Sequence, residues 1–327
     1  MPPDRWTELA GRFSLGAVIT EPEFVARGAM GTVWRLETGA GRWAVKWLFP
    51  WSPADPRPAD VAVQIAAAAA GIPLPPPVLL PDGAAVIRIG GQAARVYEWA
   101  DLAAPLTPPV PPAAAAEAGR LLGLLHSLAL APAEPDDPWY SEVPAAGYWP
   151  DLAGRAAAAG AAWAAGLSAA RGLIAELQSQ VMPPQDGPRI VCHRDFNPGN
   201  VLPAAPDGRL IVLDWENSGP LPPRRELGYA LFCWSAGAGR RDQQAARAFL
   251  TGYAGAAGHP TGSGTGTGLF ATAIATHLNM LRAMSEQALT EPEHRDFAED
   301  VIADLLGHDL PDLLEMISLS GTEGELL

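Results

Sequence analysis

Short apolar runs separated by glycine and proline breaks make up the first hundred residues. These runs predict strands over residues 33–36, 43–49, 84–89 and 93–99. One helix, predicted over residues 59–70, interrupts the strands and ends at Gly71-Ile72-Pro73, because a glycine followed by a proline is typical of a helix C-terminus. The pattern predicts a sheet with one helix in this part of the chain.

The spacing of apolar residues becomes helical after the proline-rich stretch 105–112. A helix starts at these prolines, and its broad apolar face carries leucines at positions 121, 122, 124, 125 and 128. Helical patterns continue over residues 153–177, 269–284 and 297–317, with Pro311 as a break or a helix start. Two short strands are predicted at 189–192 and 209–213, on either side of a turn-rich segment. The second part of the chain is therefore mainly helical.

The change of pattern predicts two domains, residues 1–100 and residues 101–327. Residues 1–23 form an extension in which Trp6 and Phe13 dock as an added helix or as an added strand. Residues 259–268 contain too little apolar material to pack, which predicts a surface loop.

Composition and charge exclude several classes of protein. Hydrophobic residues make up 48% of the 327 residues and charged residues 18%, which is enough apolar material for a folded core. The formal net charge of -14 would repel a phosphate backbone, so a nucleic-acid partner is not expected. Cys192 and Cys233 lack the paired spacing of a zinc or redox site, which favours reduced thiols. Neither a secretory signal nor a membrane span is evident, so we expect a cytoplasmic protein.

The segments VCHRDFNPGNVL (residues 191–202) and RLIVLDWEN (residues 209–217) carry the candidate chemistry. They supply two carboxylates, Asp195 and Asp214, and the carboxamide of Asn200. Phosphoryl transfer needs an acceptor for the proton of the attacking hydroxyl and hard oxygen ligands for magnesium. A simpler interpretation is that Asp195 and Asn197 only shape a turn. The spacing His-x-Asp-x-x-x-x-Asn, followed by an aliphatic strand that ends in Asp, favours the catalytic interpretation.

HRDFNPGN and LDWEN resemble the catalytic and metal-binding segments of the aminoglycoside phosphotransferase and choline kinase-like family, which is distantly related to protein kinases. The resemblance extends from about residue 24 to residue 231. It implies an α+β, two-lobed protein kinase-like fold with a small N-terminal sheet lobe, a larger mainly helical lobe, and ATP between them. It also implies that Asp195 is the catalytic base and that Asn200 and Asp214 bind Mg²⁺.

Three upstream segments are similar to the nucleotide-binding parts of this family. GAMGTVWRL resembles the glycine loop over the phosphates, and AVK resembles the strand whose lysine contacts them; VYEWA resembles the hinge whose backbone binds adenine, although it also fits a plain last strand. The implied cofactor-binding residues are Gly28, Gly31, Val33, Lys46, Asp60, Glu98, Trp99 and Ala100.

Two positions depart from the family pattern. The helix expected to supply a glutamate partner for Lys46 offers Asp60 or, one turn later, Gln64. Glu226 stands where many relatives have an aspartate, and it retains the charge that braces the catalytic region.

Three further basic residues, one of them in the leucine-rich helix and two in the motif, have other predicted roles. We expect His126 to be a core histidine and His193 to order the catalytic loop. Arg194 contacts phosphate or pairs with an acidic neighbour.

The sequence as a whole predicts an ATP- and Mg²⁺-dependent kinase that phosphorylates a hydroxyl group of a small molecule. Aminoglycosides and amino alcohols such as choline are the favoured acceptors, ahead of macrolides, sugars and homoserine. The acidic segment 286–327 either attracts a cationic acceptor or is a solvated helical face.

Two other functions compete with this prediction. The missing helix glutamate raises the alternative of a nucleotide-binding pseudokinase that acts as a scaffold or sensor. Protein kinase activity is disfavoured, because Trp-Glu follows Asp214 and no Ala-Pro-Glu segment comes after it.

Overall fold

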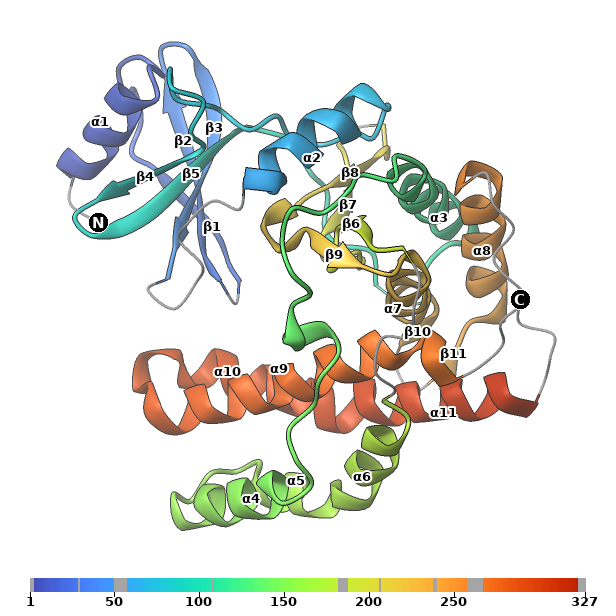
Figure 1. Ribbon diagram of the computed structural model, residues 1–327. Helices are drawn as coiled ribbons and strands as arrows, with labels where there is room; N and C mark the ends of the chain where they lie inside the picture. Colours follow the sequence, from blue (N-terminus) through green and yellow to red (C-terminus); the bar gives the residue numbers. More distant parts are fainter. Residues whose placement is uncertain are drawn as a thin grey trace. The chain divides into compact units, whose positions relative to one another are not determined.

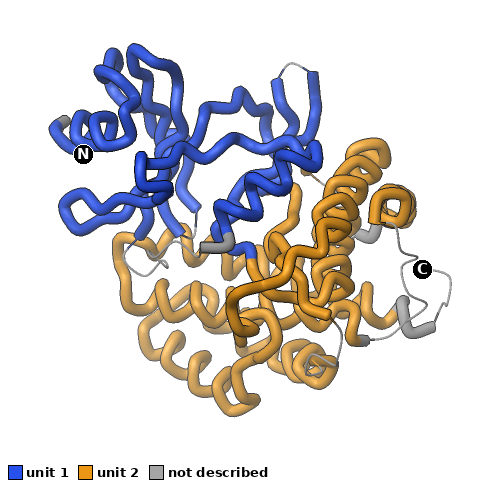
Figure 2. The backbone as a smooth tube through the Cα atoms, turned by 45° about the horizontal axis from the view of Figure 1, so that its top comes forward, with its two compact units in different colours: residues 1–105, 200–218 blue, residues 106–199, 219–327 orange. Residues whose placement is uncertain are grey.

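The computed structural model describes residues 3–28, 30–49, 58–107, 109–181, 188–205, 207–237, 240–257 and 267–322. Most of the predicted loop 259–268 lies outside these residues. The chain forms two compact units, shown in different colours in Figure 2. Unit 1 comprises residues 1–105 and 200–218, and unit 2 comprises residues 106–199 and 219–327. Residues 200–218, which follow the predicted boundary at residue 100, therefore belong with the N-terminal residues.

Unit 1 contains a five-stranded antiparallel sheet. Its strands lie in the order β1 (Glu23–Arg27), β2 (Gly31–Thr38), β3 (Gly41–Leu48), β5 (Gln92–Glu98), β4 (Val86–Ile89). The four predicted strands are thereby confirmed. Strand β1 escaped prediction because its apolar residues, Phe24 and Val25, are exposed at the sheet edge and show no inward-facing alternation.

Residues 3–12 form helix α1 (Pro3–Arg12), which decides between the helix and strand alternatives for the N-terminus. Trp6 is buried against the sheet, where its ring centroid lies 5.5 Å from that of Trp34 and 5.6 Å from that of Trp47. Phe13 is buried in the same apolar core. The helix therefore packs on the sheet through aromatic residues. Figure 1 shows α1 beside the sheet.

Helix α2 (Pro58–Ala69) confirms the predicted helix, and Gly71 ends it with a φ of +84°. Residues 200–218 add the hairpin of β7 (Val201–Pro203) and β8 (Leu210–Val212), followed by the 3₁₀ helix η2 (Trp215–Asn217). The backbone N–H of Val212 donates to the carbonyl of Pro73 at 2.8 Å, and that of Ala103 donates to Pro203 at 2.8 Å. These bonds join the hairpin to the rest of unit 1.

Helices α3 (Pro112–Ser127) and α8 (Gln243–Ala257) of unit 2 pack with their backbones in close approach (Figure 1). Glycines make this possible. A Cβ at Gly119 would meet the carbonyl of Phe249, and one at Gly252 would meet the carbonyl of Ala116. The leucine face predicted for α3 is buried in unit 2.

The remaining helices of unit 2 are α4 (Tyr148–Ala158), α5 (Ala164–Ala169), α6 (Arg171–Ser179), α7 (Pro223–Ser235), α9 (Ala271–Thr290), α10 (Arg295–Asp304) and α11 (Leu310–Thr322). A π-helical turn, η5 (Leu305–Asp309), joins α10 to α11. Pro311 is the second residue of α11, directly after this π-helical turn, so the predicted break or helix start at Pro311 coincides with the change from π-helix to α-helix.

Short elements of unit 2 complete the fold. Strand β6 (Ile190–Cys192) pairs antiparallel with β9 (Gly219–Leu221), and β10 (Ala236–Gly237) pairs with β11 (Arg240–Arg241). The 3₁₀ helices are η1 (Pro138–Tyr140), η3 (Thr267–Leu269) and η4 (Pro292–His294). Within the described ranges, every helix is too short or too polar to span a bilayer.

Candidate active site

Lys46 of β3 lies at the centre of a charged cluster in unit 1. Its ammonium group forms ion pairs with Asp214 and, at 3.2 Å, with Oε2 of Glu216. Asp214 adopts a left-handed backbone conformation with φ +59°, directly before η2, so the chain turns there and presents both carboxylates to the lysine. Sequence motifs predicted Lys46 and Asp214 but not Glu216.

The cluster has more negative than positive charge, because two carboxylates share one lysine. Burial, together with the nearby charge of Glu216, raises the pKa of Asp214 to about 7 despite the opposing effect of Lys46. Burial also opposes ionisation of Glu216, but the charge of Lys46, a hydrogen bond with Asp214 and the charge of Arg95 hold the pKa of Glu216 below its ordinary value. A divalent cation beside Asp214 would relieve this excess of negative charge.

Asn200 and Asp214, the two predicted magnesium ligands, both belong to unit 1. The backbone N–H of Leu213, next to Asp214, donates to the backbone carbonyl of Asn200 at 2.8 Å. One carboxylate and one carboxamide oxygen are hard donors, which suit Mg²⁺ with water and phosphate oxygens as its other ligands. The residues present therefore fit the ion that the motif implies.

Asp60 has a different partner from the predicted one. It forms a buried ion pair with Arg95 of β5, with 2.6 Å between Nη1 and Oδ2. Gln64 donates to the backbone carbonyl of Asp60 at 3.2 Å. Lys46 forms its ion pairs with Asp214 and Glu216. The prediction that Lys46 pairs with a side chain of helix 59–70 is therefore wrong.

Tyr97 extends the cluster, because its hydroxyl donates to Oε1 of Glu216 at 2.9 Å. Arg95 and Tyr97 are two positions apart on β5, so their side chains leave the strand on one face. The alternation along this strand was the only feature of the sequence that related Arg95 to Tyr97. Their partners, Asp60 and Glu216, become known only from the folded structure.

Gly28 and Gly31 of the predicted glycine loop lie directly after β1 and at the start of β2. The N–H of Gly28 donates to the carbonyl of Gly31 at 2.9 Å, and a Cβ at Gly31 would meet the carbonyl of Trp47. Val33 lies directly opposite Lys46 in the β2–β3 register, so both side chains are on one face of the sheet.

The predicted hinge is partly engaged in bonds within unit 1. The N–H of Glu98 donates to the carbonyl of Pro76 at 2.9 Å, and that of Trp99 donates to Arg42 at 3.1 Å. The backbone N–H groups of Glu98 and Trp99 therefore already have acceptors. The groups of the predicted hinge that remain for adenine are the backbone carbonyls and the backbone of Ala100. Those contacts stay a prediction.

Asp195 lies in unit 2, in the loop that follows β6. Its Oδ1 accepts hydrogen bonds from the hydroxyl of Tyr229 at 2.8 Å and from Nδ2 of Asn197 at 2.7 Å. Asn197 also accepts a bond from the N–H of Gly199 at 2.8 Å. Asn197 therefore shapes the turn, as the simpler interpretation held, and contacts the predicted base as well.

Glu226 of α7 holds the backbone of this loop. It accepts hydrogen bonds from the N–H of His193 at 3.2 Å and from the N–H of Arg194. It also contacts Nε2 of His126 at 2.7 Å, and Nδ1 of His126 contacts the Tyr253 hydroxyl at 2.8 Å. Burial opposes ionisation, but the bond from His126 and the nearby charges keep the pKa of Glu226 below its ordinary value.

The two histidines have the structural roles expected of them. Because an ionised carboxylate only accepts, Nε2 of His126 carries the proton that Glu226 receives as a hydrogen bond. His193 accepts a bond from the N–H of Asp195 at 3.3 Å and so orders the loop.

Arg194 is only 1% exposed, and it adopts a left-handed backbone conformation with φ +67°. Its guanidinium lies 4.2 Å from the ring centroid of Tyr140 and 3.9 Å from a carboxylate oxygen of Asp137. A Cβ at Gly219 would come within 2.7 Å of the guanidinium carbon. Of the two predicted roles, pairing with an acidic neighbour is the one observed.

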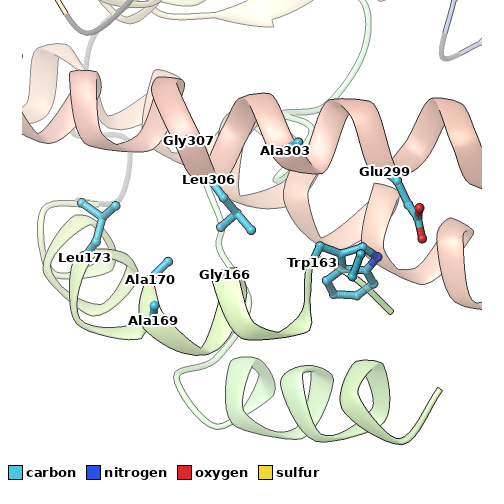
Figure 3. Close-up of a pocket in the computed structure, with 10 residues that line it drawn as sticks. Trp163, Gly166, Ala169, Ala170, Leu173, Glu299, Ala303, Leu306 and Gly307 are labelled. Carbon is cyan, nitrogen blue, oxygen red and sulfur yellow. The ribbon is translucent and has the colours of Figure 1, made fainter. Parts of the chain in front are cut away.

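A separate pocket of about 680 Å³ lies in unit 2 between α5–α6 and α10–η5 (Figure 3). Figure 3 shows Trp163 and Gly166 on one side and Ala303 and Leu306 on the other. The lining includes none of the predicted catalytic, cofactor-binding or magnesium-binding residues, although Glu299 of the acidic segment 286–327 contributes to it. We assign this pocket no part in the reaction.

Comparisons with known proteins were made for the sequence and for the fold. No curated protein sequence matches the chain. Among solved structures, spectinomycin phosphotransferase in complex with ADP and spectinomycin is similar with a TM-score of 0.68 and 13% identity, over 99% of both chains. A microcompartment-associated aminopropanol kinase is similar with a TM-score of 0.63 and 16% identity, over 97% of this chain and 99% of that one.

A third similar structure is the choline kinase LicA from Streptococcus pneumoniae, with a TM-score of 0.56 and 16% identity over 92% of this chain and 97% of that one. At these identities the likeness concerns the fold, which is that of the kinases. Residues 21–260, more than half of the chain, match the sequence profile described as the phosphotransferase enzyme family. This chain therefore belongs to the phosphotransferase enzyme family and has its protein kinase-like α+β fold.

Proposed function

We propose that this phosphotransferase transfers the γ-phosphate of ATP to a hydroxyl group of a small molecule that also carries an amine. The observation that carries the proposal is the cluster of Lys46, Asp214 and Glu216, adjacent to Asn200 in unit 1. Phosphate and magnesium binding require both signs of charge, and here a lysine lies between two partly buried carboxylates. We also place the enzyme in the cytoplasm, where ATP is supplied and where free thiols such as Cys192 and Cys233 persist.

In this proposal the residues of unit 1 bind and orient the nucleotide. Lys46 contacts the α- and β-phosphates, and the carboxylate of Glu216 holds the lysine in place. Asp214 and Asn200 hold Mg²⁺, which would neutralise charge on the β- and γ-phosphates. The backbone at Gly28 and Gly31 approaches the phosphates, and Val33 covers the adenine, on the same sheet face as Lys46.

Asp195 of unit 2 takes the part of the base. It orients the acceptor hydroxyl and receives its proton as the oxygen attacks the γ-phosphorus. The new O–P bond forms while the bond to the β-γ bridging oxygen breaks, and ADP leaves with the bonding electrons. Hydrogen bonds from Tyr229 and Asn197 hold the Asp195 side chain.

Two observations favour an acceptor with an amine. Spectinomycin phosphotransferase, aminopropanol kinase and choline kinase, all similar in fold, bear the names of amino-substituted alcohols. The acidic segment 286–327 belongs to unit 2, as does Asp195. Within it, Glu286 forms an ion pair with Arg155 at 2.6 Å. Burial and the charges of Asp304 and Asp312 raise the pKa of Asp309 against the opposing effect of His277. A cationic acceptor would compensate that charge.

The test is an acceptor screen with the purified full-length chain and Mg²⁺-ATP. The panel contains spectinomycin, other aminoglycosides, 1-amino-2-propanol, choline, ethanolamine, a macrolide, a sugar and homoserine. ADP release is measured by a coupled assay, and the phosphorylated product is identified by mass spectrometry. We expect acceptor-dependent ADP release with an amine-bearing acceptor, and its loss by a factor of about 10² or more in Asp195→Asn.

Two other results would change the conclusion. Saturable Mg²⁺-ATP binding with no transfer to any acceptor would favour a pseudokinase. Turnover that survives in Asp195→Asn would contradict the role given to Asp195.

A further inference from the structure

Helix α7 contacts the catalytic loop through two side chains on one helical face. Glu226 and Tyr229 are three positions apart, a spacing that places both side chains on the same side of a helix. Glu226 binds backbone N–H groups of the loop. Tyr229 instead contacts the carboxylate of Asp195, the group that the proposed function assigns to proton transfer.

Two donors converge on one oxygen of this carboxylate. The Tyr229 hydroxyl donates to Oδ1 of Asp195 at 2.8 Å, and Nδ2 of Asn197 donates to the same atom at 2.7 Å. The two donor groups lie 3.4 Å apart. Since Oδ1 is held from two directions, rotation of the carboxylate about its Cβ–Cγ bond is restricted, and the direction of Oδ2 is restricted with it.

Tyr229 is itself fixed in place. Only 6% of the residue is exposed, and its ring centroid lies 6.1 Å from that of His277 on α9. Burial, and then the charge of Asp195, raises the pKa of Tyr229 well above its ordinary value, so the hydroxyl keeps its proton and remains a donor. Asn197 belongs to the loop itself, whereas Tyr229 ties the carboxylate to a helix.

We propose that Tyr229 is a positioning residue, which orients the Asp195 carboxylate toward the acceptor hydroxyl. This inference rests on the proposed function, because it acts through Asp195 as the proton acceptor. A misdirected base affects the transfer step and leaves nucleotide binding alone, since the nucleotide is bound by residues of unit 1. Loss of the hydroxyl should therefore lower kcat without changing the KM for ATP.

The experiment compares the wild type with Tyr229→Phe, Asp195→Asn and the double variant. All are assayed with the panel acceptor that the wild type phosphorylates fastest. Rates are divided by the concentration of nucleotide-binding sites, so that a partly unfolded sample does not imitate a slow enzyme. Ser235→Ala is the matched control, because it also removes a buried hydroxyl hydrogen bond from α7, the one that Ser235 donates to the carbonyl of Leu231 at 2.6 Å, and it leaves the contacts of Asp195 in place.

We expect Tyr229→Phe to lower kcat about tenfold to a hundredfold, with the KM for ATP within a factor of two. In the Asp195→Asn background the same change should cost less than twofold, because the group that Tyr229 orients is already gone. Ser235→Ala should retain the wild-type kcat.

Two results would overturn the inference: an unchanged kcat in Tyr229→Phe, or an equal loss with and without Asp195. Failure of the wild type to phosphorylate any acceptor would instead count against the proposed function.

Discussion

Replacement of Glu226 by alanine tests how strongly α7 holds the catalytic loop. The carboxylate accepts hydrogen bonds from the N–H groups of His193 and Arg194 and from His126, and all of these groups are buried. Alanine leaves two backbone N–H groups and one imidazole N–H without this acceptor. Each buried donor left unsatisfied costs about 1–3 kcal/mol, so the two backbone groups alone predict a loss of about 2–6 kcal/mol.

A loss of this size is a large part of the total stability of a folded domain, which is about 5–15 kcal/mol. The assay is urea unfolding followed by fluorescence of the 11 tryptophans. Glu226→Asp keeps the charge on a shorter side chain and should fall between the wild type and the alanine variant. Glu117→Ala is the control, because Glu117 forms a more exposed pair with Arg120 and should change stability by less than about 1 kcal/mol.

The lowered pKa of Glu226 also predicts that the stability of the protein depends on pH. Because folding lowers the pKa of Glu226, its contribution to stability is fully present above the ordinary value of 4.5 and is lost as the pH falls through the lower value of the folded state. The stability difference between the wild type and Glu226→Gln should therefore be largest near neutral pH and should shrink below about pH 4.5. An alanine variant within about 0.5 kcal/mol of the wild type, or a glutamine difference independent of pH, would refute this reasoning.

Three further substitutions follow from the contacts. Lys46→Met leaves Asp214 and Glu216 without their shared cation, so ATP turnover should fall by about a hundredfold or more; equal steady-state kinetics would contradict the assigned role. Asp60→Ala removes the carboxylate that pairs with buried Arg95 and should lower the free energy of unfolding in urea by about 3–5 kcal/mol. A decrease below about 1 kcal/mol would mean that water solvates the guanidinium. Gly219→Ala places a methyl group against the Arg194 guanidinium and should cost about 1–3 kcal/mol; an unchanged melting temperature would show that the arginine can move aside.

Much of the secondary structure was predictable because its signals are local. Apolar alternation and glycine or proline breaks located four strands of the sheet, and Gly71 and Pro73 located the end of α2. Helix α1 was left undecided, since Trp6 becomes informative only when Trp34 and Trp47 are known to lie beneath it. The alanine-rich stretch 153–177 divides into separate helices, one break being at Gly160 with φ +70°.

The residues of the candidate site also fall into those that local sequence signals predicted and those that they did not. Asp195, Asn200 and Asp214 were predicted because their residue types and spacing meet the needs of phosphoryl transfer within a short segment. Glu216 and Tyr97 were not predicted, since they are 119 positions apart in the sequence and their bond exists only in the folded chain. No rule of local spacing connects such residues.

The sequence by itself determined which chemistry the chain can perform. The carboxylates, the carboxamide and the lysine needed for phosphoryl transfer lie in short motifs that can be recognised by residue type and spacing. Only the tertiary structure decided which charges meet: Lys46 with Asp214 and Glu216, and Arg95 with Asp60. Electrostatic and hydrogen-bonding partners are selected by distance in space. In this chain the decisive pairs come from segments far apart in the sequence, so their choice depends on how the strands and helices pack.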